Sequence, residues 1–308
     1  MAFSEAYHKQ VALLIRALPF VAQEDCFALK GGTAINLFVR GMPRLSVDID
    51  LTYLPVLARA ASLTAIDAAS KRIAGRLRPA MPGALITALP LQPEQVVTKL
   101  LVRADDAQIK IEVTPVMRGC VYDPELRSVS PAVEERFGFA EIQVVSFADL
   151  YAGKIVAALD RQHPRDLFDV RGLLAQEGID DLLRRAFLVY LLSHNRPLAE
   201  LLAPNRNPMS VEFSRGFQGM TAEPVSLDEL VAVRESLINL VVGMMPEPHR
   251  RFLVSFERGE PDWQLLGVPN ARDLPAVRWK QQNLDKLQPA QRAKLVRQLE
   301  ALLAKPAT

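Results

Sequence analysis

The chain has 308 residues, and its content of 49% hydrophobic and 23% charged residues is typical of a folded globular protein, which excludes a largely disordered one. The formal net charge of +2 excludes a basic field over the whole molecule, so any surface for nucleic acid must be local. No stretch of about 18 apolar residues occurs, and Cys26 and Cys120 lie far apart in apolar surroundings, so we expect free thiols in a cytoplasmic protein without a membrane anchor.

Two elements are expected before the first motif. Apolar residues recur at helical intervals over residues 5–18, which predicts an amphipathic helix that ends at Pro19. Residues 26–29 form an apolar run, which predicts a short buried strand. This strand would lead directly into a turn that contains two glycines.

Gly31, Gly32 and Thr33 follow this strand and open a short predicted helix over residues 34–40. The free N–H groups and the positive dipole end of a helix start favour a bound phosphate. Glycines also lack the Cβ atoms that would block a close ligand. The turn is therefore a candidate nucleotide-binding element.

An acidic strand follows a loop that contains Arg44 and Ser46, and these two side chains could touch phosphate, although a solvated loop arginine explains Arg44 equally well. Asp48 and Asp50 alternate with apolar residues, so the period of two in a strand places both carboxylates on one face. The two positions lie about 6.6 Å apart along a strand. That spacing allows both carboxylates to hold one Mg²⁺ or a pair of them. A phosphate-binding turn followed by paired carboxylates is the minimal set of groups for nucleotidyl transfer.

A long helix is predicted next, over residues 58–78, with four basic residues towards its end, namely Lys71, Arg72, Arg76 and Arg78. The C-terminal end of a helix favours cations in any protein. Contact with nucleic acid is the alternative explanation of this cluster.

Two β-rich runs, over residues 95–103 and 108–117, are separated by a short turn and predict a β-hairpin. In the second run Lys110 and Glu112 share one face, opposite an apolar face. Glu112 is a candidate third metal-binding carboxylate if this strand lies beside the acidic strand. A solvated strand glutamate is the alternative.

A Ser-x-x-Asp spacing typical of a capping box predicts a further helix over residues 147–159. Lys154 lies within it among small residues. A point charge that reaches a triphosphate and an ordinary solvated lysine explain this position equally well.

The next helix is predicted to begin near Pro164. Asp166 lies just inside its start, where a carboxylate is favoured in any protein. Arg165 and Asp169 stand four residues apart and could pair with each other. His163 has no neighbouring His/Cys constellation, so a zinc site is not expected.

Five segments occur in a characteristic order, namely Lys-Gly-Gly-Thr (30–33), Ser-Val-Asp-Ile-Asp-Leu (46–51), Lys-Ile-Glu (110–112), Asp-Leu-Tyr-Ala-Gly-Lys (149–154) and Arg-Asp-Leu-Phe-Asp (165–169). Together they resemble the AbiEii-type nucleotidyltransferase toxins of bacterial toxin–antitoxin and phage-defence systems. The resemblance implies a polymerase-β-like nucleotidyltransferase core, Mg²⁺ with Mn²⁺ as a possible substitute, a nucleoside triphosphate donor, tRNA acceptor ends as substrate and a cognate antitoxin.

The same resemblance implies roles for individual residues. Thr33 would contact phosphate, and Asp48 and Asp50 would bind metal. Lys154 would bind the triphosphate, and Asp166 would complete the catalytic set. The family often has aspartate where Glu112 stands, which leaves the third metal carboxylate open.

The remainder of the chain is dominated by helical patterns, the clearest over residues 182–192, 227–242 and 290–303. Residues 268–308 hold eight basic and three acidic residues, an excess of +5 in a chain whose net charge is +2. This segment is the best local case for a polyanionic partner, and a solvated helix face is the alternative.

We therefore expect an α+β protein with a mixed sheet, in which residues 1–177 form a nucleotidyltransferase domain and residues 178–308 form an α-helical domain. Trp263 and Trp279 are expected in its core. The expected reaction transfers NMP from an NTP to an acceptor hydroxyl, with a tRNA 3′ end as the acceptor, and blocks translation and growth. Transfer to a protein or a small molecule, and a catalytically silent binding module, are the alternatives.

Overall fold

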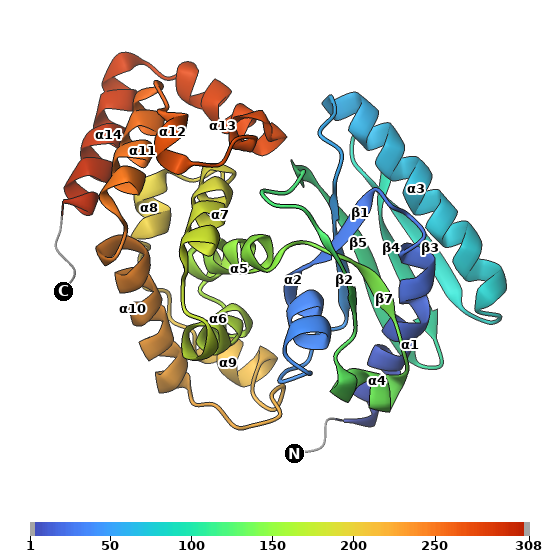
Figure 1. The fold of residues 1–308 in the computed structure, drawn as a ribbon. Coiled ribbons are helices and arrows are strands. Elements are labelled where there is room, and N and C mark those ends of the chain that lie inside the picture. The colour runs from blue at the N-terminus through green and yellow to red at the C-terminus, as the bar shows by residue number, and fades with distance from the viewer. Residues whose placement is uncertain (1–3, 305–308) are drawn as a thin grey trace. The chain divides into compact units, whose positions relative to one another are not determined.

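The structure is a computed structural model that describes residues 4–304 (Figure 1). The chain forms two compact units. The first consists of Met1–Ser146 together with Gly219–Pro224, and the second of Phe147–Gln218 together with Val225–Thr308.

The described part of the first unit is built on one mixed sheet of seven strands, in the order β3-β4-β5-β2-β1-β7-β6. Its strands are β1 (Phe27–Lys30), β2 (Asp48–Tyr53), β3 (Leu85–Leu91), β4 (Val96–Ala104), β5 (Ala107–Arg118), β6 (Glu125–Ser128) and β7 (Glu141–Val144). Its helices are α1 (Glu5–Val21), α2 (Gly31–Thr33), η1 (Ala34–Val39), α3 (Arg59–Ala80) and α4 (Pro131–Phe137). Strands β2 and β5 pair in parallel, as do β1 and β7, and the other pairs are antiparallel.

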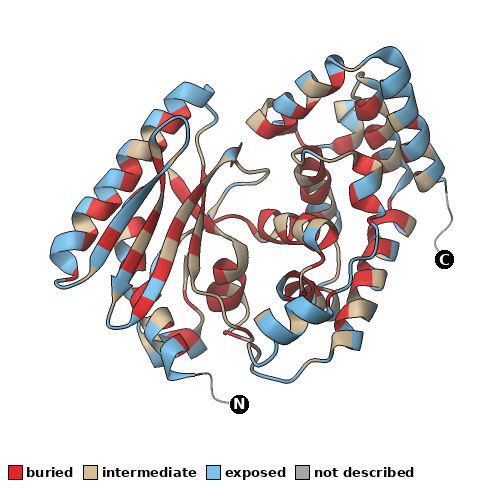
Figure 2. Cartoon of the chain, turned by 180° about the vertical axis from the view of Figure 1, so that it is seen from behind, coloured by how far each residue is buried: buried red, intermediate tan, exposed pale blue. Residues whose placement is uncertain are grey.

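The core of this unit lies between the sheet and two long helices, because α1 and α3 pack against its strands (Figure 1). Ile109, Ile111 and Val113 of β5 are buried, whereas Lys110 and Glu112 between them are only half-buried. Figure 2 shows the same alternation of buried and more exposed residues along the strands. Burial of the apolar positions thus fixes which face of β5 carries its charged side chains.

The predicted hairpin of β4 and β5 is confirmed, and its turn consists of two residues. Asp105 and Asp106 have positive φ values of +47° and +63°. A two-residue turn with positive φ at both positions matches the right-handed twist of the flanking strands.

One predicted boundary and one predicted helix geometry in this unit differ from the structure. Helix α1 contains Pro19 and continues to Val21, because a proline in the last turn removes one hydrogen bond without preventing that turn. The helix after the glycine turn has π geometry over Ala34–Val39. The Asn36 side chain donates to the Gly32 carbonyl at 2.8 Å and so occupies the acceptor of a regular α-helical bond.

Four elements of this unit were not predicted, namely β3, α4, β6 and β7. Strand β3 is at the edge of the sheet, its Leu85 and Leu89 are exposed, and Pro90 interrupts its pattern. An edge strand of this kind lacks the clean alternation that a half-buried strand shows.

The described part of the second unit is helical. It consists of α5 (Phe147–Arg161), α6 (Pro164–Gln176), α7 (Asp181–Leu192), α8 (Leu198–Leu202), α9 (Ser210–Gly216), α10 (Leu227–Gly243), α11 (Glu247–Arg258), α12 (Trp263–Leu266), η2 (Ala271–Asp273), α13 (Pro275–Asp285) and α14 (Pro289–Leu303). All the helices predicted from residue 147 onwards are confirmed. Trp263 contacts the rings of Phe252 and Phe256, whereas Trp279 was expected in the core and is 46% exposed.

The boundary between the compact units differs from the one expected at residue 177. It lies at Ser146, because α5 packs along α7 and α6 packs along α10. The segment Gly219–Pro224 returns to the first unit, where the Leu45 N–H donates to the Met220 carbonyl at 2.9 Å. Within residues 4–304, no helix combines the length and the apolar character needed to cross a bilayer.

Candidate active site

The candidate site in the first unit starts with the carboxylates of β2. Asp48 and Asp50 flank the fully buried Ile49, so both point to the sheet face opposite the core. The parallel pairing of β2 with β5 sets Asp50 opposite Glu112. The three carboxylates singled out from the sequence therefore lie on neighbouring positions of one face.

Three lysines share this face with the carboxylates, and no role for them was predicted from the sequence. Lys110 Nζ lies 2.9 Å from Glu112 Oε2 and 3.5 Å from Asp48 Oδ2. Lys99 Nζ lies 3.1 Å from Glu112 Oε1. Lys30 stands opposite Asp50 in the pairing of β1 with β2. A cross-strand row of Lys99, Glu112, Asp50 and Lys30 thus spans four strands, with Lys110 beside it.

The charges of this face act on one another. Burial raises the pKa of Asp50, Lys110 opposes the rise, and the charge of Asp48 adds to it. Partial burial also acts to raise the pKa of Glu112, but the hydrogen bonds from Lys110 and Lys99 outweigh it and hold that pKa below its usual value. Glu112 is therefore ionised and already engaged by two cations.

These residues fit a magnesium site with two protein carboxylates. Mg²⁺ is commonly held by one or two carboxylates, with water and substrate phosphates completing its shell. Asp48 and Asp50 supply such a pair on adjacent positions of one face. Within residues 4–304, no group of three or more His, Cys, Asp or Glu side chains is arranged to hold a metal ion. Glu112 therefore stands beside the pair without forming a preassembled three-carboxylate site with it.

The glycine turn lies directly against Asp50. Gly31 has a φ of +78°, and a Cβ added there would stand 2.9 Å from Asp50 Oδ2. A Cβ on Gly32 would stand 2.7 Å from Arg44 Nη2 and 2.8 Å from Ser46 Oγ. Side chains at either position would push these groups away, so the glycines bring the turn, Arg44, Ser46 and Asp50 together.

A buried hydrogen-bond network holds the turn and the loop that follows it. Thr33 Oγ1 and Ser46 Oγ lie 3.1 Å apart, and the Ser46 N–H donates to Tyr7 Oη at 3.0 Å. The Arg44 N–H donates to Asn36 Oδ1 at 3.2 Å, and the Arg44 side chain is buried. The turn therefore has a fixed cation beside it.

Tyr7 and Asn36 belong to this network, and neither was predicted from the sequence. Burial raises the pKa of Tyr7 to about 12, so its hydroxyl stays protonated and can accept the Ser46 N–H. No signal in a helical stretch marks Tyr7. A sequence signal did mark Asn36, because an amide side chain is unusual in a short apolar helix.

Gly32→Ala is expected to weaken nucleotide binding on the order of tenfold, because the new methyl group displaces Arg44 and Ser46. Gly75→Ala is the matched control, since a Cβ there meets nothing within 4 Å inside α3. Binding of a nonhydrolysable NTP, measured by calorimetry, compares the two variants. Equal affinities would show that the turn does not contact the nucleotide.

A second cluster lies inside the second unit, around Lys154 of α5. Lys154 Nζ lies 2.8 Å from Asp166 Oδ1 and 3.0 Å from Asp169 Oδ2, and its side chain is 8% exposed. Arg161 Nη2 donates to Asp166 Oδ2 at 2.8 Å. Lys154 is thus not a solvated helix lysine. It is a buried cation held by two carboxylates. One of them is Asp169, for which the sequence predicted only a pair with Arg165.

The basic end of α3 has a structural explanation. Arg72 and Arg76 both bind the carboxylate of Glu24, whose side chain is 4% exposed. Lys71 Nζ pairs with Asp67 at 2.6 Å. These three cations are engaged inside the first unit, which favours the structural explanation of this cluster over contact with nucleic acid.

The basic C-terminal segment divides into engaged and exposed side chains. Lys280 is buried and donates to the carbonyls of His194 and Arg196. Arg292 binds the Leu284 carbonyl at the end of α13. Lys294 and Arg297 of α14 are exposed.

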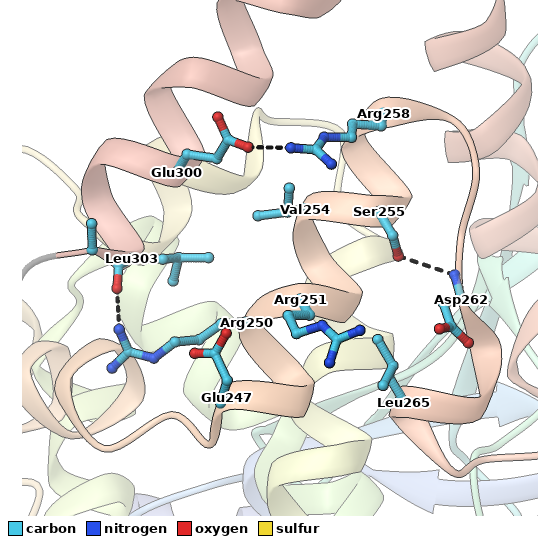
Figure 3. Close-up of a pocket in the computed structure, with 11 residues that line it drawn as sticks. Glu247, Arg250, Arg251, Val254, Ser255, Arg258, Asp262, Leu265, Glu300 and Leu303 are labelled. Carbon is cyan, nitrogen blue, oxygen red and sulfur yellow. Dashed lines mark hydrogen bonds and ion pairs between the residues drawn. The ribbon is translucent and has the colours of Figure 1, made fainter.

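A pocket of about 450 Å³ lies beside this segment, between α11, α12 and the end of α14 (Figure 3). Arg258 pairs there with Glu300, and Arg250 binds the Leu303 carbonyl. Arg251 lines the same pocket, and Figure 3 draws no interaction for it with the other residues shown. Three arginines and three carboxylates line the pocket, so the pocket itself is not strongly basic.

Comparisons with known proteins agree with these features. A family model described as "Nucleotidyl transferase AbiEii toxin, Type IV TA system" matches residues 12–283. A comparison with curated proteins gave no match. Among solved structures, MenT4, a nucleotidyltransferase toxin from Mycobacterium tuberculosis H37Rv, has a similar fold with a TM-score of 0.57 and 17% identity, over 97% of this chain and 95% of that one. The predicted α+β nucleotidyltransferase fold is confirmed.

Proposed function

The chain belongs to the AbiEii family of nucleotidyltransferase toxins of type IV toxin–antitoxin systems, and from this membership we propose that it transfers NMP from an NTP to the 3′-terminal hydroxyl of a tRNA, with Mg²⁺ or Mn²⁺ as cofactor. Such a modification would block aminoacylation and arrest growth. A cognate antitoxin would counteract it.

One observation carries this proposal. Asp48 and Asp50 share a sheet face, and the Gly31 turn approaches Asp50 so closely that a Cβ would stand 2.9 Å from its Oδ2. The proposed metal-binding pair and the proposed phosphate-binding turn therefore lie against each other. Nucleotidyl transfer requires both, because the reacting phosphate must lie at the metal.

The chemistry follows from these groups. The acceptor oxygen attacks the α-phosphorus, the bond to the bridging oxygen breaks, pyrophosphate leaves and the hydroxyl proton passes to solvent. A divalent ion bound by Asp48 and Asp50 would supply charge stabilisation to the transferring group. Arg44 and the N–H groups of the Gly31–Thr33 turn would bind phosphate oxygens. Glu112 would serve as a third metal ligand only after its lysines release it.

Lys154 and Asp166 are proposed to act on the triphosphate and in the catalytic set, as the family resemblance implies. The ion pairs of Lys154 support a positioned cation, since two carboxylates restrict its ammonium. A restricted lysine loses less conformational freedom when it binds a phosphate.

Incubation of the purified protein with each α-labelled NTP and total RNA tests the acceptor and the donor together. We expect label from one NTP in a band of tRNA size on a denaturing gel, and loss of that label with EDTA. Label on protein would favour the other acceptor class. No transfer from any NTP would favour a silent binding module.

The exposed cations of α14 are proposed to bind the RNA backbone. Lys294→Glu with Arg297→Glu should lower RNA affinity and flatten its dependence on salt, by roughly 0.7–0.9 in the slope of log K against log salt for each phosphate that the protein no longer neutralises. Arg292 is left intact, because it binds the Leu284 carbonyl.

The matched control reverses two exposed cations of α1, Lys9 and Arg16, and so changes the net charge equally. Filter binding of tRNA at several salt concentrations compares the variants, and NTP affinity should be unchanged in both. Identical salt slopes for the α14 variant and the control would show that these cations of α14 do not contact the RNA.

A further inference from the structure

Lys110 occupies an unusual position on the acidic face. It lies on β5 between the buried Ile109 and Ile111, so its side chain must project on the face that carries the carboxylates. Its ammonium lies 3.5 Å from Asp48 Oδ2 and 2.9 Å from Glu112 Oε2. One cation therefore bridges two carboxylates, and one of these is a proposed metal ligand.

The strand register imposes this contact. The pairing of β2 with β5 sets Lys110 opposite Asp48, and Glu112 follows two residues later on the same face. On its other side Lys110 faces Leu101 of β4, which offers no charge. Within residues 4–304, Lys110 is the only cation paired with Asp48, whereas Glu112 has a second lysine on its other oxygen, 3.1 Å away.

We propose that Lys110 is an internal counter-cation of the metal site, which neutralises Asp48 in the metal-free protein and must leave Asp48 before a divalent ion can bind. This inference rests on the proposed role of Asp48 as a metal ligand. The displaced ammonium keeps its bond to Glu112 and remains beside the site as a donor for phosphate oxygens. Metal binding without nucleotide should therefore be weak, and the nucleotide should favour it by drawing the ammonium away from Asp48.

Lys99 provides a matched control. It carries the same charge on the neighbouring strand and also binds Glu112, but no ion pair joins it to Asp48 in the described residues. Its side chain is 34% exposed and that of Lys110 is 29% exposed, so solvent screens the two charges similarly. A general effect of positive charge would appear when either Lys99 or Lys110 is replaced. Competition for Asp48 would appear only when Lys110 is replaced.

The test is the affinity of the nucleotide-free full-length protein for Mn²⁺, measured from the electron paramagnetic resonance signal of free Mn²⁺. Lys110→Met should tighten binding on the order of tenfold, because it removes a unit charge beside the ligand oxygen. Lys99→Met should change the affinity by less than about threefold, since its contact is with Glu112. Lys110→Gln keeps a donor for Glu112 without the charge. It should also tighten Mn²⁺ binding, and it serves as the test if Lys110→Met fails to fold.

Thermal unfolding gives a second measurement. Without metal, Lys110→Met should unfold at a lower temperature than wild type, because Asp48 and Glu112 then lose the cation that they share. Saturating Mn²⁺ should raise its melting temperature by more than that of wild type. Unchanged or weaker Mn²⁺ binding in Lys110→Met and Lys110→Gln, or equal tightening in Lys99→Met, would overturn the proposal.

Asp48→Asn separates this inference from the proposed function. It should abolish specific Mn²⁺ binding whether or not Lys110 competes. Wild-type affinity in Asp48→Asn would refute the metal site itself. Lost binding in Asp48→Asn with no effect of Lys110→Met would refute only the role of Lys110.

Discussion

Asp48→Asn and Asp50→Asn are each expected to lower kcat by on the order of 10³ or more while leaving the protein folded. Each substitution keeps the size of the side chain and removes the charge of one proposed metal ligand. The side chain of Asp48 is 49% exposed, and neither aspartate belongs to the buried apolar set of β2. The loss should therefore fall on the chemical step and not on stability.

Transfer of label from an α-labelled NTP to RNA measures this effect, and thermal unfolding measures the stability. Asp105→Asn is the matched control, because it makes the same chemical change in the exposed hairpin turn, where asparagine tolerates the positive φ of +47°. Full transfer activity in either β2 variant would be incompatible with the two-carboxylate mechanism.

Much of the acidic face could be predicted from local sequence. The alternation around Asp48 and Asp50 fixes their shared face, and burial of the alternate residues confirms it. The predicted hairpin also implies which residues of its two strands stand opposite each other. A two-residue turn at Asp105 and Asp106 sets Lys99 opposite Glu112, so the Lys99 ion pair could have been anticipated.

The pairing of β2 with β5 could not be predicted in the same way. These strands are parallel, and the whole of α3, β3 and β4 lies between them in the sequence. No turn geometry fixes the register of such a pair, because it arises from packing of the complete sheet. The contact of Lys110 with Asp48 depends on that register and therefore could not be predicted from the sequence.

The Lys154 cluster shows a different limit. Asp166 and Asp169 lie three residues apart on α6, and one helix face can therefore present both carboxylates to α5. The sequence suggested a local pair of Arg165 with Asp169, since pairs at this spacing are common. In the structure Asp169 binds Lys154 of the preceding helix. A tertiary contact, which spacing does not reveal, gives these carboxylates their partner.

Lys154→Ala is expected to lower both stability and activity, in contrast to a substitution of a solvated lysine. Its ammonium is the shared partner of Asp166 and Asp169, whose side chains are 3% and 1% exposed. Removal of one partner of a buried ion pair costs about 3–5 kcal/mol. Urea unfolding should show this loss, so reduced activity of the single variant would not by itself assign a role to Lys154.

The double variant Lys154→Met with Asp169→Asn resolves this ambiguity, because it removes one positive and one negative charge together. We expect it to recover most of the lost free energy of unfolding, since the cluster keeps its net charge and the Arg161 bond to Asp166. Transfer activity should nevertheless stay about 10²-fold below wild type, because the variant lacks the cation that is proposed to stabilise the developing charge on the phosphate. Asp169→Asn alone, which retains Lys154, should keep far more activity. Recovery of activity together with stability in the double variant would make Lys154 a structural residue and remove it from the triphosphate site.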